Sequence, residues 1–142
     1  MSGDDTRVDL RTIDGCFDGV IPPVLATCSA EGEPNITHLS QVYLVDDDHV
    51  GMSNQFFSKT AANVAANPHA ALLVTDSNTY DTFQMDLHYE RTETTGALFD
   101  TLKASLEAIA SLMGMEDVFV LRGVDVYRVV SCRRVAFGAT SA

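Results

Sequence analysis

The chain has 142 residues, a length that suits one domain with a real core and is short for two. Its 20 acidic and 9 basic residues give a formal net charge of −11, which disfavours nucleic-acid and anionic-membrane partners because phosphate surfaces repel it. The longest uncharged run, residues 60–75, contains Pro68 and two asparagines, so we expect no membrane-spanning segment.

Three widely spaced cysteines, Cys16, Cys28 and Cys132, show no CxxC spacing. This pattern indicates neither a zinc site nor a dithiol redox motif. The odd cysteine count, together with the lack of a recognisable signal peptide, predicts a protein of the reducing cytoplasm.

The first third of the chain is rich in strand and turn signals. Residues 9–17 predict a short helix, and residues 24–29 predict a strand. The sequence EGEP at 31–34 is a turn, and the run 36–45 is rich in β-forming residues, so the two flanking segments predict a hairpin. Residues 50–53 predict a third strand.

Three consecutive acids, Asp46, Asp47 and Asp48, lie between two of these strands. They resemble a metal cluster at first sight. However, the spaced acids and terminal glutamate of a calcium loop are absent. We therefore interpret the three aspartates as a solvated turn and predict no metal site.

The middle of the chain contains a clear helix signal. In SNQFFSKTAANVAANP, Ser58 is well placed as an N-cap for a helix over residues 59–66, and Asn67-Pro68 ends it. The alanines of that helix allow close packing against a sheet. Residues 70–75 and 83–92 then predict two further strands.

A longer helix is predicted over residues 96–111, because apolar side chains recur on one face at helical spacing, namely Leu98, Leu102, Leu106 and Ile109, with Phe99 beside them. Residues 113–121 predict one or two more helical turns. Residues 124–130 predict a closing strand, and the tail after Arg134 is small, polar and expected to be loose.

These elements predict a mainly β fold, a six-stranded antiparallel split β-barrel with peripheral helices, because short hairpin turns favour antiparallel pairing. We expect a single domain over residues 1–142, with its core at about 20–131, a short N-terminal helix and a loose C-terminal tail.

The predicted start of the helix at residue 59 suggests an anion site. A helix N-terminus offers unpaired N–H groups and a positive dipole end. Ser58 and Thr60 add hydroxyl groups, and Lys59, one of two lysines in the chain, adds a charge. Together they could hold a phosphate. The alternative is that Ser58 only caps its own helix while Lys59 points into water.

Three segments in this order resemble the pyridoxamine 5'-phosphate oxidase-like, FMN-binding split-barrel family. They are PPVLATCSAEGEPNITHLSQVYLVDDDHVGMSN, SKTAANVAANPHAALLV and FQMDLHYERTE, and the resemblance covers residues 21–130. The family implies a homodimer with FMN bound in a groove between two barrels. It also implies that the flavin, once bound, carries the hydride chemistry.

The resemblance also implies which residues would contact FMN. Ser53, Asn54 and Gln84 would contact the flavin or its ribityl chain, and Ser58 and Lys59 would hold the phosphate. Relatives carry basic residues where this chain has Thr37, Val42 and Thr60. Ser40 and Gln41 could compensate in part for the missing contacts to the phosphate. The full predicted cofactor-binding set is Ser40, Gln41, Ser53, Asn54, Gln55, Ser58, Lys59, Thr60 and Gln84.

The function implied is an FMN-dependent oxidoreductase acting on a small molecule, with no catalytic residue assigned. Four late arginines could bind a substrate phosphate, namely Arg122, Arg128, Arg133 and Arg134. One alternative is a non-catalytic flavin- or ligand-binding sensory module, which the missing basic residues favour. The resemblance also leaves open a haem-binding relative, with His38 or His88 as axial ligand, and a deazaflavin-binding relative.

Overall fold

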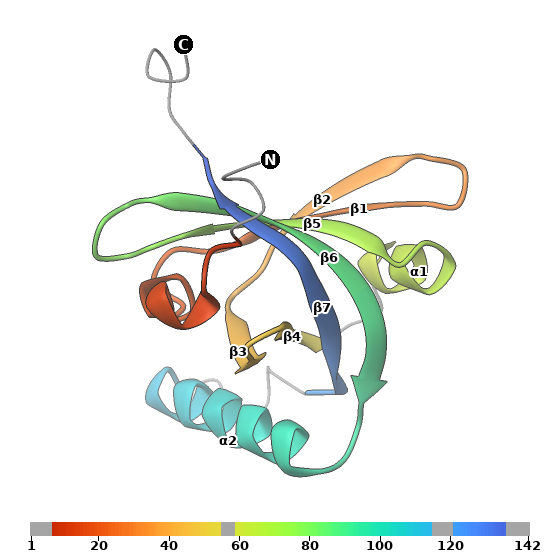
Figure 1. Ribbon diagram of the computed structural model, residues 1–142. Helices are drawn as coiled ribbons and strands as arrows, with labels where there is room; N and C mark the ends of the chain where they lie inside the picture. Colours follow the sequence, from red (N-terminus) through yellow and green to blue (C-terminus); the bar gives the residue numbers. More distant parts are fainter. Residues whose placement is uncertain (1–6, 55–58, 115–120, 136–142) are drawn as a thin grey trace.

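The computed structural model describes residues 7–54, 59–114 and 121–135. Figure 1 shows a strongly curved sheet, a long helix below it, and a short helix beside an arm made of two strands. In chain order the elements are two 3-10 turns at Leu10–Thr12 and Asp14–Cys16, β1 (Val24–Cys28), β2 (Pro34–His38), β3 (Val42–Asp46), β4 (His49–Asn54), α1 (Lys59–Ala66), β5 (His69–Thr75), β6 (Thr82–Glu93), α2 (Ala97–Leu112) and β7 (Gly123–Arg134).

One antiparallel sheet contains seven strands in the order β2-β1-β5-β6-β7-β4-β3. The edge strands β2 and β3 follow each other in sequence but pair with different neighbours, β1 and β4. No ladder joins β2 to β3 within the described residues, so the sheet curls without closing.

The predicted mainly β antiparallel fold is therefore confirmed, whereas the prediction of a six-stranded barrel is wrong. The run 36–45 is not one strand, because the chain leaves the sheet at residues 39–41. These residues carry the chain from β2, which pairs with β1, to β3, which pairs with β4, and there the Gln41 side-chain amide donates to the Phe17 carbonyl at 2.8 Å.

Two β-bulges bend the central ladder between β6 and β7. The register shifts between Asp86 and Leu87 and again between Tyr89 and Arg91. A bulge bends its strand and increases the local twist. β7 pairs with β6 along one edge and with β4 along the other, and β3 pairs with β4 at the end of the sheet.

The two faces of the sheet differ in burial. We call the face with Leu25, Leu72 and Met85 the inner face, because these side chains belong to the main hydrophobic core. The outer face carries the alternate residues, including Val24 and Leu73. This alternation follows from the two-residue period of a strand.

The helices predicted over residues 59–66 and 96–111 are confirmed. The helical turns predicted over residues 113–121 fall mostly at 115–120, outside the described residues. α1 begins and ends where the sequence indicated, and Val64 places it against the main core on the inner face. α2 covers the start of β7, where Leu102 packs with Val124 and Val126. The predicted buried face of α2 is wrong at one position. Ile109 is exposed, and Ala110 is buried in its place. None of the described helices is long and apolar enough to cross a lipid bilayer.

The N-terminal segment packs on the core as two 3-10 turns, where the sequence predicted a helix over residues 9–17. Gly15 explains part of the difference, since it lies against Asp76 so closely that a Cβ atom would come within 2.5 Å of the carboxylate oxygen. Leu10, Ile13 and Cys16 enter the main core from this segment.

The turn at Asp46–Asp48 holds that N-terminal segment in place. Arg7 donates to the Val129 carbonyl at 3.0 Å and to the Asp48 carboxylate at 2.7 Å, and Arg11 pairs with Asp47. All three aspartates are exposed, in agreement with a solvated turn. Within residues 7–54, 59–114 and 121–135, no group of three or more His, Cys, Asp or Glu side chains is arranged to bind a metal ion.

The Leu10 side chain provides a test of the N-terminal packing, because it is 0% exposed although it lies near the chain start. Leu10→Ala should lower the free energy of unfolding by about 2–5 kcal/mol, since it removes buried methyl groups and leaves a cavity. Val20→Ala, at a 68% exposed position, is the control and should change the stability by less than about 0.5 kcal/mol. Equal urea midpoints for Leu10→Ala and the wild type would contradict this packing.

Candidate functional site

The predicted phosphate site lies where β4 leads into α1. Ser53 is half-buried near the end of β4 and pairs with Val124 of β7, and Asn54 is the last residue of the strand. The Asn54 side chain and the predicted contacts Gln55 and Ser58 lie outside the described residues. The site is therefore described from Ser53 on one side and α1 on the other.

Lys59 is the first residue of α1, and its ammonium is not free. The Nζ atom lies 2.9 Å from the Glu33 carboxylate in the turn between β1 and β2. The hydrogen bond and the charge of Lys59 lower the pKa of Glu33. Both side chains are mostly exposed, so the ion pair is of the weak, solvent-screened kind.

Two more contacts tie the same helix to the β1–β2 arm. The Asn35 amide lies 3.5 Å from the Thr60 hydroxyl, and the buried Asn63 amide donates to the Thr27 hydroxyl at 3.1 Å. The arm and helix start thus bring together an ammonium, a hydroxyl and an amide. These donor types fit a phosphate, provided that it replaces Glu33 at Lys59.

The residues from the end of β2 to the start of β3 differ in their surroundings. Gln41 uses its side-chain amide to hold the Phe17 carbonyl, so that group is engaged within the fold. Ser40 is exposed in the same loop. Thr37 donates to the neighbouring His38 carbonyl at 3.3 Å. Val42 is 0% exposed in the main core, so its side chain fills space between strands.

Gln84 lies on the outer face, away from α1. It sits between Leu73 of β5 and Arg133 of β7, whereas α1 packs on the inner face. Along β7, the partners of Gln84 and Ser53 are residues 133 and 124, a separation of about 30 Å along the strand. A single chain therefore does not bring Gln84 next to the start of α1.

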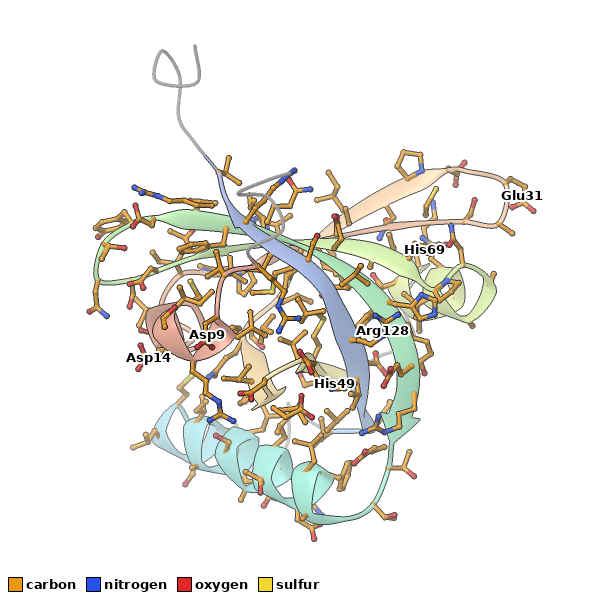
Figure 2. The ribbon with its side chains drawn as sticks, viewed as in Figure 1. Asp9, Asp14, Glu31, His49, His69 and Arg128 are labelled. Atoms are coloured by element: carbon orange, nitrogen blue, oxygen red, sulfur yellow. The ribbon has the colours of Figure 1, made fainter. Side chains whose placement is uncertain are left out.

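The late arginines and the histidines are distributed over several surfaces. Arg128 and His49 pair across β7 and β4, and both approach Glu90, at 3.7 and 3.0 Å (Figure 2). Arg134 pairs with Asp81 at 2.8 Å. The rings of His69 and His88 meet edge to face at 5.3 Å between centroids.

A polar cluster near the end of β4, with two buried and two more exposed members, was not found from the sequence. It consists of Tyr89, Thr92, Asp125 and Tyr127, and we call it the Asp125 cluster. The Thr92 hydroxyl donates to the Asp125 carboxylate at 2.6 Å, and the Tyr89 hydroxyl lies 2.5 Å from Thr92. The sole signal in the sequence is an aspartate two residues from a tyrosine in an otherwise apolar strand, which is weak by itself.

Tyr127 is the most buried member of this cluster. Its side chain is 0% exposed and packs edge-on to Tyr89, with 5.5 Å between ring centroids. Its hydroxyl has no hydrogen-bond partner among the described residues. Burial raises the pKa of Tyr127, and the charge of Asp125 adds to the shift.

Comparison with protein families identifies the fold. The model for pyridoxamine 5'-phosphate oxidase matches residues 20–129, which is most of the chain. The chain belongs to the pyridoxamine 5'-phosphate oxidase family. A comparison with curated proteins finds no sequence match.

Solved structures with the fold of this pyridoxamine 5'-phosphate oxidase family include an FMN-binding protein from Syntrophomonas wolfei, 20% identical, with a TM-score of 0.73 over 92% of this chain and 90% of that one. HupZ from Group A Streptococcus is 18% identical, with a TM-score of 0.73 over 93% and 98% of the two chains. HutZ, a haem storage protein from Vibrio cholerae, is 15% identical, with a TM-score of 0.60 over 94% and 98%. Identities this low show a shared fold.

Tyr127→Phe tests the unusual hydroxyl. A buried hydroxyl without a partner costs about 1–3 kcal/mol, so its removal should leave the stability unchanged or raise it by up to that amount. The raised pKa adds a second effect: the wild type should lose stability as the pH rises above about 10, and the variant should lose less. Urea unfolding at neutral and alkaline pH measures both, and a clear destabilisation at neutral pH would contradict the assignment.

Proposed function

We propose that this chain is a cytoplasmic FMN-dependent oxidoreductase that acts on a small molecule as a homodimer. Membership of the pyridoxamine 5'-phosphate oxidase family and the FMN-binding structural neighbour support the cofactor. The observation that carries the proposal is the set of phosphate-type donors at the start of α1. The three free cysteines support a reducing compartment.

The phosphate end of FMN would lie at the start of α1. The positive end of the helix and the first N–H groups attract an anion there. Lys59 would exchange Glu33 for the phosphate, and Thr60 and Asn35 would add neutral hydrogen bonds. The exchange costs little because the Lys59–Glu33 pair is open to solvent.

The flavin ring would lie between two copies of the chain. Gln84 is on the outer face whereas α1 packs on the inner face, so one protomer would hold the phosphate while its partner presents Gln84 to the ring. The outer face is suited to such a contact. It carries exposed apolar side chains that a monomer would leave in water, namely Ile36 at 72%, Val130 at 53% and Leu73 at 39% exposure.

In this arrangement bound FMN supplies two-electron chemistry, and the protein positions it and excludes water. Lys59 and Thr60 hold the cofactor in place. Gln84 offers an amide that donates to or accepts from the ring edge, and the neighbouring Arg133 adds a positive charge on the same face. The small-molecule substrate would approach the ring from the opening between the protomers.

A second candidate is a haem-binding protein, which the likeness to HutZ and the ring contact between exposed His69 and half-buried His88 support. A third is a ligand-binding module without catalysis, which the Glu33 carboxylate at Lys59 supports. A visible absorbance spectrum after incubation with FMN or haem and removal of the unbound ligand separates flavin binding from haem binding. Turnover of a reduced nicotinamide with an artificial acceptor separates the oxidoreductase from a module without catalysis.

The lysine at α1 gives a direct test of FMN binding. Lys59→Met should weaken FMN binding about 10- to 100-fold, since it removes one charge-assisted contact to the phosphate. Glu33→Gln should strengthen binding several-fold, because the competing carboxylate is gone. Fluorescence quenching of FMN on titration with protein measures both dissociation constants.

Lys103→Met is the matched control, since Lys103 is the second lysine and lies exposed on α2. It should bind FMN like the wild type. Equal losses for Lys59→Met and Lys103→Met would show a general charge effect and contradict the site at α1.

Leu73 tests the proposed dimer. Leu73→Glu places a charge at the centre of the outer face and should convert a dimer into a monomer, because the charge would be desolvated on association. Leu112→Glu, at an 89% exposed position on α2, is the control and should stay dimeric. Light scattering coupled to size exclusion gives the masses, and a monomeric wild type would refute the two-chain site.

A further inference from the structure

Two histidines lie side by side across the ladder between β5 and β6. His69 (Figure 2), the first residue of β5, is the register partner of His88, and their rings meet edge to face with 5.3 Å between centroids. Both belong to the outer face, because the next register pair, Ala70 and Leu87, packs in the main core on the inner face. His69 is exposed and His88 is half-buried, so the pair is open to solvent.

The ring nitrogens of this pair are not engaged elsewhere in the fold. Within the described ranges 7–54, 59–114 and 121–135, neither ring has a hydrogen-bond partner. His49 shows the contrast, because its two ring nitrogens lie 2.8 Å from Asp46 and 3.0 Å from Glu90. A neutral imidazole has one nitrogen with a free lone pair. His69 and His88 therefore offer two adjacent nitrogen ligands.

The separation of the two rings fits one shared metal ion. Zinc binds imidazole nitrogen at about 2.0–2.1 Å in tetrahedral geometry, which places the centres of two rings on one ion about 5 Å apart. The observed 5.3 Å agrees with that separation. The χ2 torsion of histidine is broad, so the rings turn easily towards a common point while the backbone stays in place.

The backbone on both sides of the pair is fixed by neighbouring contacts. The His69 N–H donates to the Asn67 side-chain oxygen at 3.3 Å. Directly after His88, the Tyr89 N–H donates to the Pro68 carbonyl at 2.8 Å. Ligands held on strands of a sheet lose little freedom when an ion binds, so this placement favours a metal site.

The charges around the pair do not oppose a cation. Arg128 of β7 is the other register partner of His88, but its guanidinium lies 3.7 Å from the Glu90 carboxylate, which offsets its charge. Asp86, two residues before His88 on the same face, carries a carboxylate that accepts from Ser131 at 2.8 Å. The net charge of −11 also attracts divalent cations to the molecule as a whole.

We propose that His69 and His88 bind one divalent metal ion of the zinc class per chain, through one ring nitrogen each. No third His, Cys, Asp or Glu side chain joins them in the part of the chain that the structure describes, so water takes the other two positions of the tetrahedron. Two protein ligands hold zinc less tightly than the four of a structural site, so we expect an exchangeable ion with a dissociation constant in the micromolar range. The site does not depend on the proposed flavin.

Zinc chloride is the probe, titrated calorimetrically into flavin-free protein that a chelator has cleared of metal. The wild type should bind one Zn²⁺ per chain and should not bind Mg²⁺ comparably, because Mg²⁺ prefers oxygen ligands. His69→Asn and His88→Asn should each weaken Zn²⁺ binding about tenfold or more, since one imidazole ligand is lost. His38→Asn is the matched control. His38 is exposed on the same face, with Val24 as its register partner, and its loss should leave the affinity unchanged.

NMR of the histidine ring nitrogens shows directly which side chains hold the ion, and it needs no variant. With ¹⁵N-labelled histidine, Zn²⁺ should shift a ring nitrogen of His69 and one of His88. The His49 nitrogens should stay in place, because both are already engaged. Zinc also binds thiolates, so Cys28→Ser, at a half-buried free cysteine, is a second control and should still bind one Zn²⁺ per chain.

Four results would overturn the site. They are a wild type that binds no Zn²⁺, equal affinities for His69→Asn and the wild type, Mg²⁺ binding as tight as Zn²⁺ binding, and loss of the ion in Cys28→Ser with unmoved ring nitrogens. Each of them leaves the proposed flavin site untouched, because FMN is absent from these experiments. Conversely, a wild type that binds Zn²⁺ but no FMN would refute the flavin proposal alone.

Discussion

The bent ladder between β6 and β7 is the constraint on which the rest of the structure depends. Its two register shifts bend β6 and β7, and β7 pairs with β4 along its other edge. That double pairing places the end of β4 next to Asp125, and it sends the following chain towards α1. On the outer face, Gln84 of β6 and Arg133 of β7 lie side by side as register partners. Lys59 and Gln84 therefore lie on different faces of the sheet, which is the physical reason for proposing a site built from two chains.

The excess of acidic residues determines where the basic side chains lie. With a net charge of −11, most basic side chains find an acidic partner, as Arg7, Arg11 and Arg134 do. Asp47 and Asp48 thereby anchor the N-terminal segment. Lys59 follows the same pattern, since Glu33 occupies its ammonium. A phosphate that binds there must displace that carboxylate from Lys59. Because an exposed ion pair contributes little free energy, the displacement costs little.

Local signals in the sequence predicted the elements well and their assembly less well. Alternation, capping and the Asn67-Pro68 stop located α1 to the residue and most strands closely, because these features are encoded by neighbouring side chains. The split of the run 36–45 depended on the Gln41–Phe17 contact, which local patterns do not encode. The separation of Gln84 from Lys59 and the meeting of Thr92 with Asp125 both arise from strand register across distant segments. Family resemblance supplied the candidate residues, whereas only three-dimensional pairing revealed the Asp125 cluster.

The central claim is that the junction between β4 and α1 binds the phosphate of a flavin. Calorimetric titration of the wild-type protein with FMN and, separately, with riboflavin tests it most directly, because the two ligands differ only in the phosphate. The account predicts FMN binding about tenfold tighter than riboflavin binding or better, as expected for a charge-assisted contact, and a difference that shrinks with added salt. Equal affinities for the two ligands, or no binding of either, would contradict it.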